Sequence, residues 1–183
     1  MIKRPIELSH DFLAEVIDEK SVVVDATMGN GYDTLFLAQK AGCVYAFDIQ
    51  KKALERTRQR LEKANCLANV NLILDGHEKV ARYVTKAISA AIFNLGYLPS
   101  ADKSLITKPA TTLSALSAIL EKLQVGGRVS LMVYYGHEGG DKEKDAVLEF
   151  VESLSQEHYA TMLYQPLNQI NTPPFLIMIE KLR

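Results

Sequence analysis

One short segment near the start of the chain constrains the fold more than any other. Residues 22–24 form an uninterrupted apolar run that ends in Asp25, and Ala-Thr-Met-Gly-Asn-Gly follows directly before a helical pattern. Glycine is used where the backbone needs a positive φ or where a ligand must approach closely. A strand, a glycine turn and a helix in this order predict a nucleotide-type cofactor over the helix N-terminus, bound around Gly29 and Gly31.

A second acid supports this interpretation. The apolar run 44–47 ends in Asp48, about seventeen residues after Gly31. An acid at the tip of the second strand is where folds of this kind bind a ribose diol. The glycine turn and Asp48 together are therefore more specific for a nucleotide-type cofactor than either feature alone.

Length and composition are those of an ordinary globular protein. A chain of 183 residues fits a single domain over 1–183 and leaves little room for two. The formal net charge of −1 gives no overall electrostatic case for nucleic acid or an anionic membrane, so a polyanion would have to meet a local patch. Cys43 and Cys66 lack metal-ligand spacing, and no zinc signature is found, so we expect free thiols and no metal.

The sequence also bears on location. The N-terminal residues lack the apolar stretch of a signal peptide, and no apolar run reaches transmembrane length. We therefore expect a cytoplasmic protein with no membrane partner.

The remainder of the chain alternates short apolar strands with helical patterns. Strands without polar alternation are typical of a sheet that helices cover on both faces, so we predict an α/β, doubly wound, Rossmann-like fold. Ser9 is the expected N-cap of a first helix that covers the cofactor mouth. Strands are predicted over 21–26, 43–48, 70–74, 90–95, 128–135, 159–164 and 175–180, with helices over 32–41, 51–64, 77–85, 109–123 and 142–154.

The end of the chain departs from this alternation. The segment between the last two strands contains three prolines and shows no helical periodicity, which favours an antiparallel last strand in a mostly parallel, seven-stranded sheet. A dinucleotide dehydrogenase would continue with βα units, and its fingerprint would place Gly or Ala where Thr34 stands. Both observations favour S-adenosylmethionine over a nicotinamide cofactor.

The chain shows a resemblance to known enzymes. The segment 25–34, which reads DATMGNGYDT, together with Asp48 and Asp75, closely resembles the first three motifs of class I S-adenosylmethionine-dependent methyltransferases, although Thr27 stands where the broad class has glycine. With segments 93–99 and 134–140, it resembles a small family first described as ribosomal RNA methylases. Better-studied members of that family methylate 5-aminomethyl-2-thiouridine at the wobble position of transfer RNA.

The resemblance implies how the chain works. It covers nearly the whole domain and implies a class I methyltransferase fold, S-adenosylmethionine as cofactor and the anticodon region of transfer RNA as partner. The domain carries no obvious RNA-binding module, so RNA would lie across the loops at the carboxyl edge of the sheet. We also consider a homodimer, because a second subunit would enlarge the RNA-binding surface of so small a chain.

With this cofactor in view, each motif acquires an expected role. The amides around Asn30 and Gly31 can meet the methionine carboxylate, and Asp25 or Asp33 suits the ammonium, although Asp33 also fits the first turn of a helix. Asp48 would accept from the ribose hydroxyls. Three further residues are expected to bind the cofactor: Gln50 at the ribose or adenine edge, Asp75 at the exocyclic amine, and His77 at the adenine ring, with plain helix-start positions as the alternative for Gln50 and His77.

The acceptor side follows the fourth and fifth strands. The side-chain carbonyl of Asn94, or a neighbouring backbone carbonyl, can accept a hydrogen bond from a substrate amine, and Tyr97 can stack on a flipped base. The alternative for this segment is a capped turn with a buried tyrosine. The loop after the fifth strand would form a lid over the acceptor, or else an ordinary surface loop. It places Tyr134, Tyr135 and Glu138 at the substrate, and His137 or Glu138 can take the proton of the amine.

The sequence allows alternatives both for the role of the basic residues and for the function. The basic residues of helix 51–64 form either a solvated face or an RNA track, and Lys3, Arg4, Lys103 and Lys108 are better placed near the expected substrate. The rival functions are a methyltransferase that acts on ribosomal RNA or on a small molecule, and a non-catalytic nucleotide-binding module.

Overall fold

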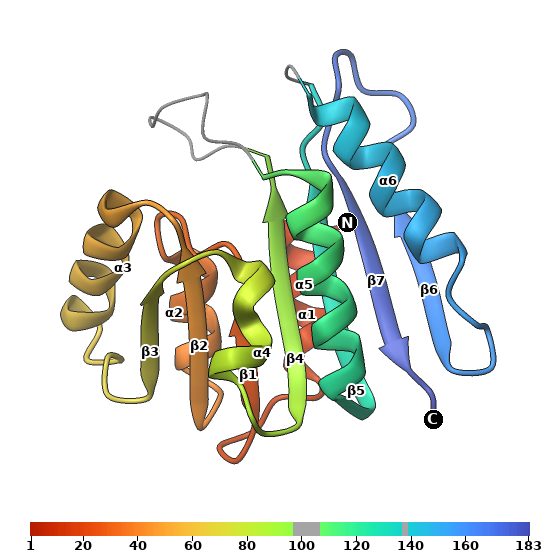
Figure 1. The fold of residues 1–183 in the computed structure, drawn as a ribbon. Coiled ribbons are helices and arrows are strands. Elements are labelled where there is room, and N and C mark those ends of the chain that lie inside the picture. The colour runs from red at the N-terminus through yellow and green to blue at the C-terminus, as the bar shows by residue number, and fades with distance from the viewer. Residues whose placement is uncertain (97–106, 137–138) are drawn as a thin grey trace.

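A seven-stranded sheet forms the centre of the computed structural model, which describes residues 1–96, 107–136 and 139–183 (Figure 1). The strand order is β3-β2-β1-β4-β5-β7-β6. The strands are β1 (Val22–Asp25), β2 (Cys43–Asp48), β3 (Val70–Leu74), β4 (Ile88–Leu95), β5 (Leu123–Val133), β6 (Tyr159–Tyr164) and β7 (Phe175–Lys181).

The strand directions follow the prediction. Neighbouring strands from β3 to β5 are parallel, whereas β7 is antiparallel to both β5 and β6. The described segment 165–174, which joins β6 to β7, contains no helix. The predicted Rossmann-like sheet, parallel except for its last strand, is confirmed.

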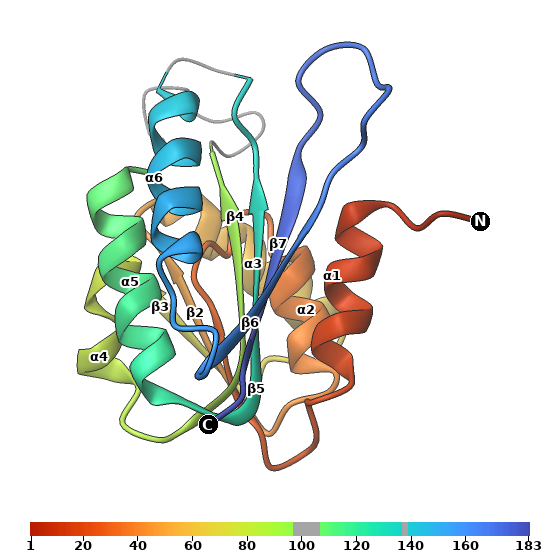
Figure 2. The same ribbon diagram turned by 90° about the vertical axis from the view of Figure 1, so that its right-hand side faces the viewer.

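Helices cover both faces of this sheet (Figure 2). Leu13 of α1, Leu37 of α2 and Leu61 of α3 share one buried cluster, whereas Leu116 of α5 and Val147 of α6 belong to the cluster on the other face, where α4 also lies. The helices are α1 (Pro5–Ala14), α2 (Tyr32–Ala38), α3 (Lys51–Lys63), the 3-10 turn η1 (His77–Lys79), α4 (Val80–Tyr83), α5 (Pro109–Lys122) and α6 (Gly140–Glu152).

The sheet has a switch point between β1 and β4. Strands β2 and β3 lie on one side of β1, whereas β4 and the strands after it lie on the other. The connections after β1 and β4 therefore diverge and open a crevice at the carboxyl ends of the strands. The register pairs Asp25 with Ala46 on β2 and with Ile92 on β4, so both neighbouring strands extend beyond the end of β1, on either side of the glycine turn.

The first helix begins earlier than predicted. Proline at position 5 suits the first turn of a helix because its φ is fixed and its missing N–H is not needed there. The carboxylate of Glu7 accepts a hydrogen bond from the backbone N–H of Arg4 at 3.2 Å. Ser9, predicted as the N-cap, lies instead within α1, where its buried hydroxyl donates to Ser130 of β5 at 2.8 Å. The prediction of a start at Ser9 is wrong, and the helix extends one turn further toward the crevice.

Other boundaries also differ from the prediction, most of all at the start of β5 and after β3. Strand β5 starts at Leu123 rather than at Arg128, because Leu123 pairs with Ile88 and a register shift follows within the glycine-containing segment. The helix predicted over 77–85 is a 3-10 turn followed by the single turn of α4.

A buried carboxylate anchors the glycine turn. Asp25, which is fully buried, accepts hydrogen bonds from the backbone N–H of Thr27 at 3.1 Å and from the hydroxyl of Thr34 at 2.6 Å. Thr34 therefore ties α2 to the end of β1. Burial, with a contribution from the nearby Asp33 carboxylate, raises the pKa of Asp25 to about 7.

Gly31 completes the turn and brings α2 against α3. Its φ is +78°, and its backbone N–H donates to the carbonyl of Met28 at 2.7 Å. A Cβ at this position would lie 2.9 Å from Cα of Thr57 on α3. Glycine is required here both by the backbone conformation and by the close approach of the two helices.

Gly31→Ala should destabilise the fold more than the same change at Gly126. Both glycines have φ near +78°, at +78° and +77°, but a Cβ at Gly126 meets no atom within 4 Å. We expect a loss of about 1 kcal/mol for Gly126→Ala from backbone strain and roughly 2–4 kcal/mol for Gly31→Ala, where steric overlap is added. Urea unfolding measures both, and equal losses would show that α3 moves away without cost.

Asp25→Asn should change how stability depends on pH. In the wild type the pKa of Asp25 is about 7 when folded, against an ordinary 3.8, so unfolding releases a proton between these values. The free energy of unfolding therefore falls as pH rises through this window, whereas asparagine does not titrate. Between pH 4 and 7 we expect the wild type to lose up to roughly 4 kcal/mol relative to Asp25→Asn, as measured by urea unfolding at each pH. Parallel pH curves for the two proteins would contradict this assignment.

Candidate active site

The larger of two cavities opens at the carboxyl edge of the sheet, at the switch point. It has a volume of about 790 Å³ and is lined by the loops after β1, β2, β3 and β4, with Ile6 of α1 at its mouth. Helix α1 thus reaches the cavity, as predicted. The sequence-predicted residues that line the cavity are Gly29, Asn30, Asp33, Asp48, Gln50, Asp75, His77, Asn94 and Tyr134.

Asp25 and Gly31 were predicted to contact the cofactor, but neither lines this cavity. Both carboxylate oxygens of Asp25 are already bonded within the protein, and the backbone N–H of Gly31 is bonded to Met28. The two residues shape the turn, and the predicted direct contacts are not supported. Asp33 is the acid of this segment that reaches the cavity.

Asp33 joins three elements at the cavity wall. One carboxylate oxygen lies 2.6 Å from Nε2 of His10 on α1, and the other accepts from the side-chain amide of Asn94 on β4 at 2.5 Å. The imidazole of His10 is stacked on the ring of Phe36, with centroids 3.9 Å apart. The contacts with His10 and Asn94 therefore fix the position of the Asp33 carboxylate through both of its oxygens.

The same contact orients Asn94. A carboxylate only accepts hydrogen bonds, so the NH2 group of Asn94 faces Asp33 and its Oδ1 is left for a donor. The backbone N–H of Asn94 donates to the hydroxyl of Thr27 at 2.7 Å, which fixes the end of β4 against the β1 turn. The structure therefore brings Asp33 and Asn94, predicted separately, into one hydrogen-bonded group.

Asp48 closes the other side of the turn. Its carboxylate accepts from the backbone N–H of Gly29 at 3.1 Å and from that of Gln50 at 2.9 Å. Burial raises the pKa of Asp48, and these two hydrogen bonds oppose the rise. Asp48 lies at the tip of β2 beside the glycine turn, where it lines the cavity.

Asp75 lies directly after β3, and the ammonium of Lys79 partly balances its negative charge. Its carboxylate pairs with Lys79 and accepts from the hydroxyl of Tyr83 at 2.9 Å. The Lys79 hydrogen bond, with that of Tyr83, lowers the pKa of Asp75 to about 2, so the carboxylate is ionised at neutral pH.

His77 presents an unsatisfied acceptor at the same wall. The residue is 8% exposed, and Nδ1 of its ring lies 3.0 Å from the carbonyl oxygen of Ala26. A carbonyl only accepts, so Nδ1 carries the proton and Nε2 has a lone pair. Burial lowers the pKa of His77, which keeps the ring neutral. Among the described residues, Nε2 has no hydrogen-bond partner, although it is buried and the residue lines the cavity. A buried polar atom without a partner suits a ligand that donates a hydrogen bond.

The residues predicted to contact the substrate do not all lie at the cavity. Tyr134 lines the cavity, and burial, with the nearby Asp33, raises its pKa. Tyr135 does not line the cavity, because its ring packs against Phe175 at 5.5 Å and under Lys144 at 5.2 Å, so its predicted substrate contact is not supported. Three predicted residues, Tyr97, His137 and Glu138, lie outside the residues that the structure describes.

A network of hydrogen bonds holds the end of β4 in place. The hydroxyl of Thr107 accepts from the N–H of Gly96 at 2.9 Å and donates to Glu143 of α6 at 2.5 Å. Glu143, 2% exposed, also accepts from Thr112 at 2.7 Å. This network ties the end of β4 to α5 and α6.

Sequence reasoning missed two features of this site. His10 was not singled out, although it lies one helical turn after Ile6, and that spacing places both side chains on one face of α1. Thr107 was also missed, because a lone threonine in a loop carries no local signal. Within the described residues, no group of His, Cys, Asp and Glu could hold a metal ion, and no helix is long and apolar enough to cross a membrane.

The chain is similar to solved structures over its whole length. A methyltransferase structure from Streptococcus mutans in complex with SAH is 66% identical, with a TM-score of 0.95 and coverage of 100% of both chains. A structure described as an rRNA methylase from Clostridium thermocellum is 43% identical, with a TM-score of 0.97 and coverage of 100% of both chains.

A relative with a stated RNA substrate is also found. The chloroplastic tRNA (mnm(5)s(2)U34)-methyltransferase of Arabidopsis thaliana is 37% identical over 195 residues, which cover 98% of this chain and 70% of the relative. The family described as "Putative rRNA methylase" matches residues 44–180. The glycine turn, the acids at the tips of β2 and β3 and the strand order agree with this match, and the chain belongs to this family of S-adenosylmethionine-dependent methyltransferases.

Proposed function

We propose that this protein methylates the amine nitrogen of 5-aminomethyl-2-thiouridine at the wobble position of transfer RNA. The relative from Arabidopsis thaliana supports this substrate by its name and its 37% identity. The observation in the structure that carries the proposal is the hydrogen-bonded group of Asp33 and Asn94 in the cavity wall. In this proposal Asp33 engages the NH2 group of Asn94, which leaves Oδ1 of Asn94 to accept a hydrogen bond from the substrate amine.

The described cavity fits S-adenosylmethionine by its donor and acceptor set. Asp48 would hold the ribose hydroxyls, and Asp33 would hold the ammonium of the methionine part. Nε2 of His77, the buried acceptor without a partner, would take a hydrogen bond from the exocyclic amine of adenine, with Asp75 nearby at the tip of β3. Amide groups of the turn around Asn30 would meet the methionine carboxylate.

The protein contributes mainly position to the reaction. When bound, S-adenosylmethionine supplies a methyl group that its sulfonium already activates. Asn94 accepts a hydrogen bond from the substrate amine at Oδ1 and so directs the nitrogen lone pair, which supplies the approach geometry. The amine must first lose a proton, and His137 or Glu138, after β5, is the proposed acceptor.

The charge of the cavity bears on the rival substrates. Asp33, Asp48 and Asp75 all line it, and among the described lining residues Lys108 is the only lysine or arginine. A carboxylate or phosphate at the methyl acceptor would be repelled, whereas an amine would be attracted. This balance favours an amine over an acidic small molecule, and the family description leaves ribosomal RNA as the rival RNA substrate.

Analysis of modified nucleosides tests the proposed substrate. Transfer RNA from a strain that lacks this protein should accumulate 5-aminomethyl-2-thiouridine, and the wild-type gene should restore the methylated nucleoside. Purified protein should transfer labelled methyl groups to that transfer RNA and not to ribosomal RNA. Methyl incorporation into ribosomal RNA or a metabolite extract would replace the proposed substrate, and tight cofactor binding without any transfer would support a binding module instead.

Asn94→Ala should slow methyl transfer far more than it weakens cofactor binding. The variant loses the acceptor that positions the amine, and a misplacement of about 1 Å can lower a rate roughly 100-fold. The affinity for S-adenosylhomocysteine should change by less than about threefold, since Asp33 keeps His10 as partner. Single-turnover rates and calorimetry measure the two effects. Thr111→Ala, which changes another residue that lines the same cavity, is the control and should alter neither the rate nor the affinity. Equal losses in rate and affinity for Asn94→Ala would show that Asn94 serves the cofactor.

A further inference from the structure

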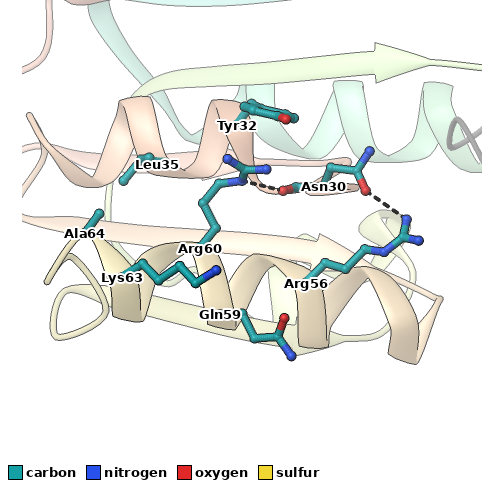
Figure 3. A pocket seen from close by; sticks show the side chains of 8 residues that line it. All are labelled: Asn30, Tyr32, Leu35, Arg56, Gln59, Arg60, Lys63 and Ala64. Carbon is teal, nitrogen blue, oxygen red and sulfur yellow. Dashed lines mark hydrogen bonds between the residues drawn. The ribbon is translucent and has the colours of Figure 1, made fainter.

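A second cavity lies between α2 and α3, next to the first (Figure 3). Its volume is about 580 Å³. Asn30 and Tyr32 line both cavities, so the two lie next to each other at the glycine turn. We refer to this cavity as the α3 groove, defined by Asn30, Tyr32, Arg56, Gln59, Arg60 and Lys63.

One face of α3 supplies the floor of the α3 groove. Arg56, Gln59, Arg60 and Lys63 follow one another at helical spacings of three, one and three residues, which places them on a single face. The two acids of the helix, Glu55 and Glu62, lie four and three residues from Gln59, at the edge of this face, and neither lines the groove. None of the described residues that line the groove is acidic. Positive charge is thus concentrated here in a chain whose net charge is −1.

The two arginines are held in place without being neutralised. The guanidinium of Arg60 lies 3.6 Å above the ring of Tyr32, and its Nε donates to the carbonyl oxygen of Asn30 at 2.8 Å. Arg56 donates from one terminal nitrogen to the side-chain oxygen of Asn30 at 3.0 Å. Figure 3 shows both guanidinium groups directed toward Asn30 from α3.

The remaining donors of the groove have no partner in the described part of the chain. Arg56, Arg60 and Lys63 form no ion pair with a described carboxylate, whereas Arg128 pairs with both Glu15 and Glu180. The terminal N–H groups of a guanidinium match the oxygens of a phosphate in geometry and charge. A fixed, unpaired arginine pair next to a lysine is therefore suited to a phosphate chain.

We propose that the α3 groove binds the sugar-phosphate backbone of the RNA substrate and leads the strand to the methylation cavity. This inference rests on the proposed function for the identity of the RNA. Arg56 and Arg60 hold one phosphate beside the glycine turn, and Lys63 holds a phosphate further along the strand. Because Asn30 and Tyr32 line both cavities, a strand on α3 would pass the glycine turn to reach the cofactor cavity.

Lys63→Gln and Gln59→Glu test the groove without disturbing the turn. Neither side chain makes a hydrogen bond or ion pair in the described structure, unlike those of Arg56 and Arg60, so cofactor binding should be unchanged. Arg58→Gln is the matched control for Lys63→Gln, because Arg58 is exposed on the other side of the same helix. Gln124→Glu, at an exposed position of β5, is the control for Gln59→Glu.

Fluorescence anisotropy with a labelled RNA hairpin, the anticodon stem and loop of a transfer RNA with wobble uridine, measures binding. We expect each groove variant to bind about 3–10-fold more weakly than its control, and Lys63→Gln to lower the slope of log affinity against log salt by about one. Affinity for S-adenosylhomocysteine should be equal in all five proteins.

The outcomes separate this inference from the proposed function. Equal losses in the groove variants and their controls would show that net charge alone acts, and would overturn the groove. A wild type that methylates transfer RNA, with groove variants that bind it normally, would overturn the groove and keep the function. Weaker binding by the groove variants supports the groove even where the methylated nucleoside proves to be another one. A wild type that binds no RNA would overturn both.

Discussion

The site depends on how two carboxylates hold one turn of backbone. Asp25 bonds to the start and end of the turn after β1, and Asp48 bonds to Gly29 in its middle. These hydrogen bonds fix the turn before any ligand is bound, so little ordering is left for binding to impose. Burial disfavours the charged form of both carboxylates and raises the pKa of each. The hydrogen bonds that they accept from backbone N–H groups partly offset this rise.

A second set of polar contacts connects the turn to the acceptor side. Asp33 links α1, α2 and β4 through His10 and Asn94, while Glu143 holds the end of β4 through Thr107. The two groups of contacts both hold the end of β4, where Asn94 and Gly96 lie two residues apart. A network of satisfied polar groups of this kind fixes a unique geometry, which catalysis by positioning requires.

The sequence predicts the strands well because each is an apolar run bounded by polar residues. It misplaces the start of α1, where proline at position 5 and the contact of Glu7 act rather than Ser9, and that of β5, where pairing with Ile88 extends the strand. The same limit applies at the site. Residues next to the glycine turn and at strand ends are predicted from local pattern, whereas His10 reaches Asp33 only through packing of α1, and Tyr135 turns into the core by contact with other elements. Such long-range contacts leave no local signal.

We infer that the turn held by Asp48 seats the methyl donor. Calorimetric titration of S-adenosylhomocysteine into the wild type and Asp48→Asn tests this inference, with circular dichroism to establish that the variant is folded. Loss of a buried, charged hydrogen-bond acceptor should weaken binding by about 1.5–3 kcal/mol, or roughly 10–100-fold. A folded Asp48→Asn variant with the affinity of the wild type would contradict the account.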